Sequence, residues 1–176
     1  MNRDQAIERL KQYRPDNYQY QHALYSEAIM RALAPRFDAD PDFWGLCGLL
    51  HDVDFPLTKD NPDEHGLKAK ELLDGLDGVT DEMLGAIMAH NSECTGREPA
   101  SNLDYALRAA ETVTGLIVAA ALVRPTGMEG MEPKSIKKKM KDKAFAAAVS
   151  RERIKECEKI GLSLDEFLDI SIKAMS

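Results

Sequence analysis

Four histidines and a few carboxylates are the residues of this chain whose types and spacing could do chemistry. The histidines are His22, His51, His65 and His90, and there are no others. Asp52 directly follows His51, at the end of an apolar segment over residues 43–50. Neutral imidazole and carboxylate oxygen are ligands for Zn, Fe, Mn and related divalent ions. Taken alone, such a pair is more often the polar end of a surface helix, where the helix dipole favours histidine.

Three of the histidines are predicted to lie in helices or at their ends. An Asp-Pro pair predicts the start of the helix that ends near His51. His22 shortly precedes a series of apolar residues at helical spacing, in a helix predicted over residues 16–33. Residues 81–90 predict a helix that ends at His90, with apolar residues on the same face. His90 should therefore point toward the interior.

The segment before His65 also contains helix-start signals. Asn61 is expected to cap a helix, with Pro62 in its first turn and Glu64 completing a capping box. His65 would then lie in the first turn, beside Gly66. A single histidine there would more often be a surface residue than a ligand, so its assignment depends on the other three.

The most apolar predicted helix covers residues 101–123 and contains Glu111. Burial of an unpaired carboxylate is costly, so Glu111 needs a cation if it faces the interior. That cation could be a metal ion, or Arg108 one helical turn earlier. Without the histidines, a solvated face would be the preferred interpretation for Glu111.

In the order His, His-Asp, two further histidines and a late acidic residue, the chain resembles the HD superfamily of metal-dependent phosphohydrolases. The resemblance covers about residues 20–125 and looks closest to small stand-alone bacterial HDIG-type proteins, whose substrates are largely unassigned. The family's late acidic residue is an aspartate, so Glu111 is a departure. The Gly-Lys found near the His-Asp pair in some members is also missing here.

The resemblance implies an all-α fold, a single-domain helical bundle of the HD-domain type over residues 1–176. The metal-site core would occupy about residues 20–125, and C-terminal helices at about 134–175 would pack on it. Within that C-terminal part, residues 144–160 predict one helix stopped by Gly161, and Ser163 begins a final helix.

The resemblance also implies how the side chains would work together. A first metal site would consist of His22, His51, Asp52 and Glu111, and a second ion would bind His65 and His90 with Asp52 bridging. One or two divalent ions are expected, of Fe, Mn, Co, Ni or Zn. They would activate water to cleave a phosphate ester of a small molecule or nucleotide, with His51 and Asp52 as the catalytic pair.

Two other functions stay open from the sequence. The superfamily also contains diiron oxygenases, and six ligands would allow that chemistry. A metal-binding or sensor domain with weak or no catalysis is favoured by Glu111 and by the missing Gly-Lys. Asp54 either orients a ligating histidine or is merely a loop residue, and the loop interpretation is slightly preferred. The basic run over residues 134–143, Arg124 or Arg151 could approach a phosphate or be solvated.

Composition limits the remaining possibilities. The chain has 176 residues, of which 44% are hydrophobic and 30% charged, as in one globular domain. Its net charge of −7 argues against general nucleic-acid binding. The three scattered cysteines suit free thiols in a reducing compartment. No signal peptide and no charge-free apolar run of membrane-spanning length is recognised, so a cytoplasmic protein without membrane partners is expected.

Overall fold

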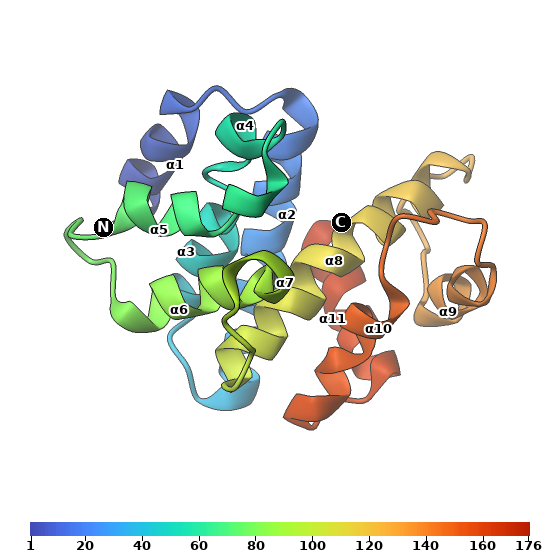
Figure 1. Ribbon diagram of the computed structural model, residues 1–176. Helices are drawn as coiled ribbons and strands as arrows, with labels where there is room; N and C mark the ends of the chain where they lie inside the picture. Colours follow the sequence, from blue (N-terminus) through green and yellow to red (C-terminus); the bar gives the residue numbers. More distant parts are fainter.

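The computed structural model describes all 176 residues, and the chain folds into helices without strands, which confirms the predicted all-α class (Figure 1). The α-helices are α1 (Arg3–Gln12), α2 (Asn17–Leu33), α3 (Pro41–Leu50), α4 (Phe55–Thr58), α5 (Leu67–Leu73), α6 (Asp81–His90), α7 (Ser92–Thr95), α8 (Asn102–Leu122), α9 (Pro133–Lys141), α10 (Arg151–Lys155) and α11 (Leu164–Met175). Short 3-10 helices are η1 (Ala34–Phe37), η2 (Pro62–Glu64) and η3 (Glu156–Ile160).

Helices α2 and α3 pack closely because a glycine lies between them. Gly48 of α3 has no room for a side chain, since a Cβ there would lie 2.6 Å from the backbone oxygen of Ser26 in α2. Both helices begin where local capping predicts, at Asp16 and at Asp40. This close approach brings the end of α3, with His51 and Asp52, against α2.

Helix α8 is the central element of the fold and runs diagonally across it in Figure 1. Helices α3 and α6 lie to one side of α8 and α9 and α10 to the other, whereas α11 passes behind α8 and packs against α2. Helix α8 begins with a capping box between Ser101 and Asp104. By length and composition α8 could cross a membrane. However, 56% of its 18-residue apolar stretch is buried inside the protein, as in a core helix.

The prediction of a helix beginning at Asn61 was wrong. Asn61 makes no side-chain cap, η2 covers only three residues, and His65 has an extended backbone. Gly66 then adopts a φ of +89°, which glycine tolerates best, before α5 begins. The physical reason is a long-range contact, because Asp54 accepts hydrogen bonds from the backbone amides of Gly66 and Ala69.

The prediction of one helix over residues 144–160 was also wrong. Turns lead from α9 to the short helix α10, and η3 follows. The guanidinium of Arg151 donates to the carbonyl oxygens of Ala146 and Val149, at 2.7 and 2.6 Å, and to that of Phe145. These carbonyl groups are thereby held in a folded loop, and Ser150 caps the helix that starts after it.

Candidate metal centre

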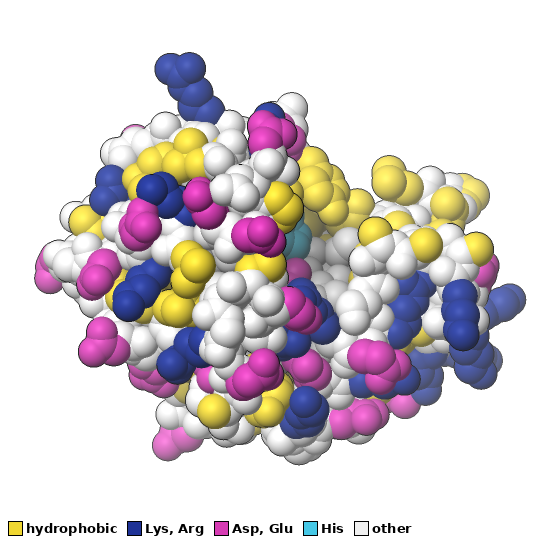
Figure 2. All heavy atoms as spheres, viewed as in Figure 1, with side chains coloured by type: hydrophobic (Ala, Val, Ile, Leu, Met, Phe, Trp, Pro, Cys, Tyr) yellow, Lys and Arg dark blue, Asp and Glu magenta, His cyan; other side chains and the backbone are white.

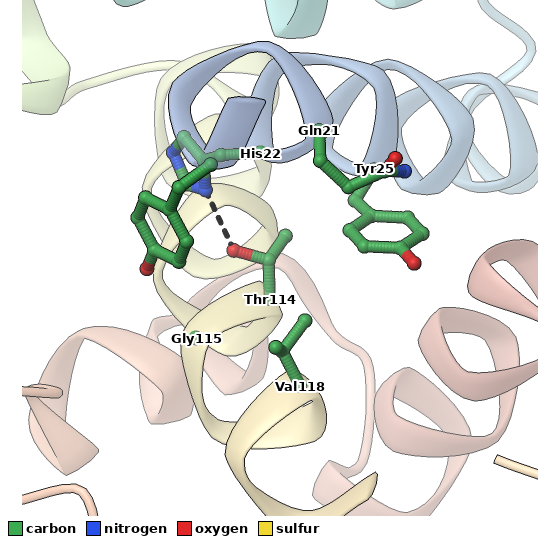
Figure 3. Close-up of a pocket in the computed structure, with 7 residues that line it drawn as sticks. Gln21, His22, Tyr25, Thr114, Gly115 and Val118 are labelled. Atoms are coloured by element: carbon green, nitrogen blue, oxygen red, sulfur yellow. Dashed lines mark hydrogen bonds between the residues drawn. The ribbon is translucent and has the colours of Figure 1, made fainter. Parts of the chain in front are cut away.

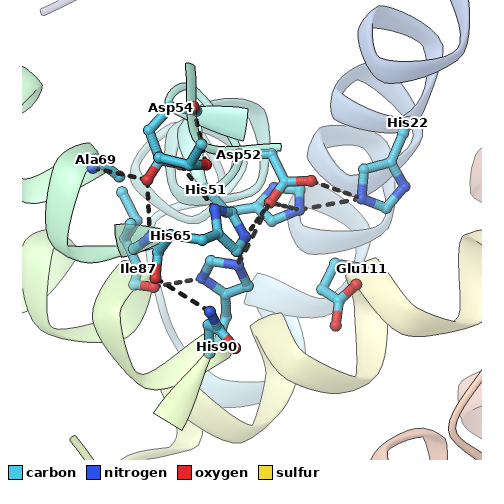
Figure 4. A network of polar contacts seen from close by, with 12 residues as sticks. His22, His51, Asp52, Asp54, His65, Ala69, Ile87, His90 and Glu111 are labelled. Atoms are coloured by element: carbon cyan, nitrogen blue, oxygen red, sulfur yellow. Dashed lines mark hydrogen bonds and ion pairs between the residues drawn. The ribbon is translucent and has the colours of Figure 1, made fainter. Parts of the chain in front are cut away.

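The structure brings all four histidines and Asp52 together from separate elements (Figure 4). His22 projects from α2, His51 and Asp52 stand at the end of α3, His65 precedes α5, and His90 ends α6. His51 is fully buried and His90 nearly so, whereas the other three side chains are between 15 and 20% exposed. The side chains therefore form a cluster that is mostly shielded but still open to solvent on one side.

Asp52 lies at the centre of this cluster. Its Oδ1 is 3.4 Å from the Nε2 atom of His51, 3.2 Å from that of His65 and 3.3 Å from that of His90. Its other oxygen, Oδ2, lies 3.5 Å from Nε2 of His22. The two oxygens of one carboxylate thus lie near four imidazole nitrogens, three of them beside Oδ1 and one beside Oδ2.

The same atoms divide into two groups that could each hold a metal ion. One group is His22, His51 and Asp52, the other is Asp52, His65 and His90. The two imidazole Nε2 atoms are 3.1 Å apart in the first group and 3.0 Å apart in the second. Metal–ligand bonds of about 2.0–2.2 Å place neighbouring ligand atoms roughly 3.0–3.5 Å apart around one ion. The separations and the N/O donors therefore fit divalent transition metals.

Each histidine is oriented by a hydrogen bond at its other ring nitrogen. Nδ1 of His51 lies 2.8 Å from the carbonyl oxygen of Gly48, and Nδ1 of His90 bonds to that of Ile87. Carbonyl groups only accept, so both Nδ1 atoms carry the proton and both Nε2 atoms present a lone pair to the cluster. This is the tautomer that metal ligation requires.

The tautomer of His22 follows from a short chain of hydrogen bonds. The Thr114 hydroxyl has one proton, which it donates to the backbone oxygen of Glu111 at 2.7 Å. It must therefore accept the bond that joins it to Nδ1 of His22 at 2.8 Å. Consequently Nε2 of His22 is also unprotonated and faces the first group.

Asp54 orients the fourth histidine, so the slight preference for a simple loop residue was wrong. The Asp54 side chain is completely buried and its Oδ1 accepts from Nδ1 of His65 at 3.0 Å. Its Oδ2 accepts from the amides of Gly66 and Ala69 at 2.8 and 3.0 Å. All of these groups donate to one carboxylate, which fixes the position of His65 as well as its tautomer.

The surroundings shift the pKa values of these groups in opposite directions. Burial lowers the pKa of His51 to about 3, so this imidazole is neutral at pH 7. Burial opposes ionisation of Asp52, yet the neighbouring histidines hold the pKa of its carboxyl group well below the usual range. Burial also lowers the pKa of His65, but hydrogen bonds to Asp52 and Asp54 outweigh it and raise this pKa to about 10.

Comparison with known families agrees with this geometry. Residues 20–144 match the HD domain. The chain belongs to the HD-domain family. Neither the curated proteins nor the solved structures contain a match to it. The matched part of this HD-domain protein includes the four histidines, Asp52, Asp54 and Glu111, whereas α10, η3 and α11 follow it.

Glu111 belongs to neither metal-binding group of the HD domain, so its role as a ligand stays a prediction. It lies on α8, on the side of the cluster between His22 and His90 (Figure 4). Burial raises the pKa of its carboxyl group. Arg108 does not pair with it, because that guanidinium bonds to Glu156 at 2.7 Å. The cation near Glu111 is instead Arg153, 3.9 Å away.

A cleft opens beside the metal-binding groups of this HD-domain protein. Figure 2 shows it between the N-terminal helices and the C-terminal segment, with a histidine at its base. A cavity of about 200 Å³ touches Asp52, His65, His90, Glu111 and Arg153. A wider cavity of about 570 Å³ shares Glu111 and Arg153 and continues past His22.

Arg153 is the functional candidate that sequence reasoning missed. It is the only lysine or arginine that lines either cavity. The basic residues that were considered lie elsewhere, since Arg151 binds loop carbonyl groups and Arg124 bonds to the backbone of Gly127 and Glu129. Nothing in the local sequence distinguishes Arg153 from Arg151, two positions earlier.

Proposed function

We propose that this HD-domain protein is a metal-dependent phosphohydrolase that cleaves a phosphate ester of a small molecule or nucleotide. The observation that carries the proposal is the Asp52 carboxylate shared by two groups of metal-ligating histidines, at the base of an open cleft. His22, His51 and Asp52 would hold one ion, and Asp52, His65 and His90 a second. When bound, such ions supply Lewis-acid activation of water and of the phosphoryl group.

Arg153 is suited to bind the phosphate. Its guanidinium contacts Glu93 at 2.6 Å, but the Glu93 side chain is 59% exposed. An exposed ion pair of this kind contributes little, about 0–1 kcal/mol, so an incoming phosphate can replace Glu93. Arginine also presents paired N–H groups that match two phosphate oxygens.

Glu111 is suited to act as the acid for the leaving group. Its side chain is only 14% exposed, and it lines both cavities of the cleft. Because burial raises its pKa, the carboxyl group holds a proton at higher pH than an exposed glutamate does. That proton can pass to the ester oxygen as the bond to phosphorus breaks.

The test pairs elemental analysis of the purified protein with phosphate release from a panel of phosphate esters. We expect up to two transition-metal ions per chain and release of phosphate from at least one ester. Asp52→Asn should lose both, because it removes the carboxylate shared by the two groups. Asp60→Asn is the matched control, since Asp60 is exposed and outside the site. A metal-loaded protein inactive on every ester would refute the proposal and favour a sensor domain, or an oxygenase if iron-dependent oxygen uptake appears.

Glu111→Gln separates the two roles considered for this residue. A residue that donates a proton can be replaced with loss of turnover and no loss of metal. We therefore expect normal metal content and activity reduced about 100-fold, within the usual range for a general acid. The loss should shrink for esters whose leaving groups need no protonation, such as p-nitrophenyl phosphate. Metal depletion in this variant would instead assign Glu111 as a ligand.

A further inference from the structure

A small pocket beside His22 is not used by the proposed hydrolysis. It lies between α2 and α8, with Gln21, His22 and Tyr25 on one side and Thr114, Gly115 and Val118 on the other (Figure 3). Tyr18 completes its wall. No charged side chain other than the titratable His22 lines it, in contrast to the cleft, where Glu93, Glu111 and Arg153 meet.

The pocket adjoins the cleft directly. Tyr18, His22, Thr114 and Gly115 line both the pocket and the 570 Å³ cavity. The Tyr18 ring lies nearly parallel to that of His22, with 8° between their planes. His22 thus forms the boundary, because its Nε2 faces the metal-binding group while its Nδ1 bonds to Thr114 in the pocket wall.

The size of the pocket limits what it can hold. Its volume is about 110 Å³. Pockets for drug-sized ligands measure about 300–1,000 Å³. At roughly 30 Å³ per water molecule, the space equals about four waters, or a group of about four non-hydrogen atoms.

We infer that this pocket receives the leaving group of the substrate, and that this group is compact, uncharged and largely apolar. The inference rests on the proposed function, because it assumes a phosphate bound at Arg153 and the metal-binding groups. The charged cleft would then hold the phosphate, and the uncharged pocket would hold the organic part beyond His22. The preferred substrates are accordingly phosphate monoesters of small neutral alcohols, and bulky or charged organic groups are disfavoured.

The experiment measures binding, which does not depend on turnover. Methyl-, butyl-, hexyl- and octylphosphonate are titrated into the metal-loaded protein by calorimetry. Burial of a methylene strengthens binding up to about fourfold. We expect butylphosphonate to bind at least about tenfold more tightly than methylphosphonate, by the same per-methylene gain. Binding should not improve further from butyl- to hexyl- or octylphosphonate.

Two substitutions at Val118 locate the effect. Val118→Phe fills the pocket and should remove the gain from methyl- to butylphosphonate, whereas Val118→Ala enlarges it and should move the optimum to hexylphosphonate. Val123→Phe is the control, on an exposed residue just past the end of α8 and outside the pocket, and should behave as the unaltered protein. Metal content and circular dichroism report whether each variant folds.

The outcomes separate the two proposals. The pocket assignment is overturned if affinity does not rise from methyl- to butylphosphonate in the unaltered protein. It is also overturned if neither Val118 substitution changes how affinity depends on chain length. Both results would count even if phosphate esters are hydrolysed. A chain-length gain that is lost in Val118→Phe, in a protein that cleaves no ester, would support the pocket and refute the hydrolase.

Discussion

The sharpest test of the candidate metal centre is to change a residue that belongs to neither metal-binding group. Asp54→Asn keeps the size of a buried side chain but alters what it offers to His65. The carboxylate can only accept, so Nδ1 of His65 must carry the proton. An amide can instead donate to Nδ1, and the proton of the neutral ring then moves to Nε2. His65 would present a proton to the ion in place of a lone pair.

The magnitude follows from the role of such supporting contacts. Their loss typically lowers metal affinity by 10- to 100-fold, which corresponds to about 1.4–2.7 kcal/mol. The loss should be confined to the group that contains His65 and His90. His22 and His51 are not oriented by Asp54, since their Nδ1 atoms bond to Thr114 and Gly48.

The assay is metal content after equilibration against buffers of fixed free metal concentration. The unaltered protein should show two ions at a concentration where Asp54→Asn shows one. Asp60→Asn removes the same charge from an exposed position and should bind as the unaltered protein. Equal affinity in Asp54→Asn and the unaltered protein, or equal loss at both groups, would show that the tautomer argument is wrong.

Three further predictions rest on other parts of the structure. Because the pKa of His65 in the metal-free protein is about 10, metal uptake at pH 7 should release about one proton from it. The metal affinity of the group that contains His65 should therefore rise about tenfold per pH unit between pH 6.5 and 8.5, as measured by titration in metal buffers. Gly48→Ala should lower the free energy of unfolding by about 1–3 kcal/mol in urea titrations, because its Cβ meets rigid backbone. Gly45→Ala should cost less, since the Arg31 side chain in its way can move. Burial raises the pKa of Cys157 to about 12 and also raises that of Cys47, so neither thiol should react with Ellman's reagent at pH 8 until the protein is unfolded.

The elements that sequence predicts well are those whose ends are fixed locally. Helices α2, α3, α6 and α8 begin at Asp16, Asp40, Thr80 and Ser101, and each of these caps an amide two or three residues away. Such contacts join residues within one helical turn, so they can be predicted from the local sequence. Three of the four histidines lie on these helices or at their ends, but their convergence was predicted from the resemblance to the HD superfamily and not from the caps.

The failures occur where distant residues decide the local structure. Asp54 accepts hydrogen bonds from the amides of Gly66 and Ala69, more than ten residues along the chain, and the helix therefore begins after Gly66 and not after Asn61. The side chain of Arg151 holds the loop that replaces the expected helix. Arg153 reaches the cleft only because the chain turns back after α9. No periodicity or capping motif encodes these contacts, so they become visible only in three dimensions.

The C-terminal segment explains how a cleft residue can lie outside the matched HD domain. Arg108 of α8 is 6% exposed and binds Glu156 of η3 at 2.7 Å, while its Nη1 donates to the Ala89 carbonyl oxygen at 2.7 Å. One guanidinium therefore ties the end of α6, next to His90, to the segment that carries Arg153. The same buried contact therefore positions the candidate metal-binding groups relative to Arg153, the arginine proposed to bind the phosphate.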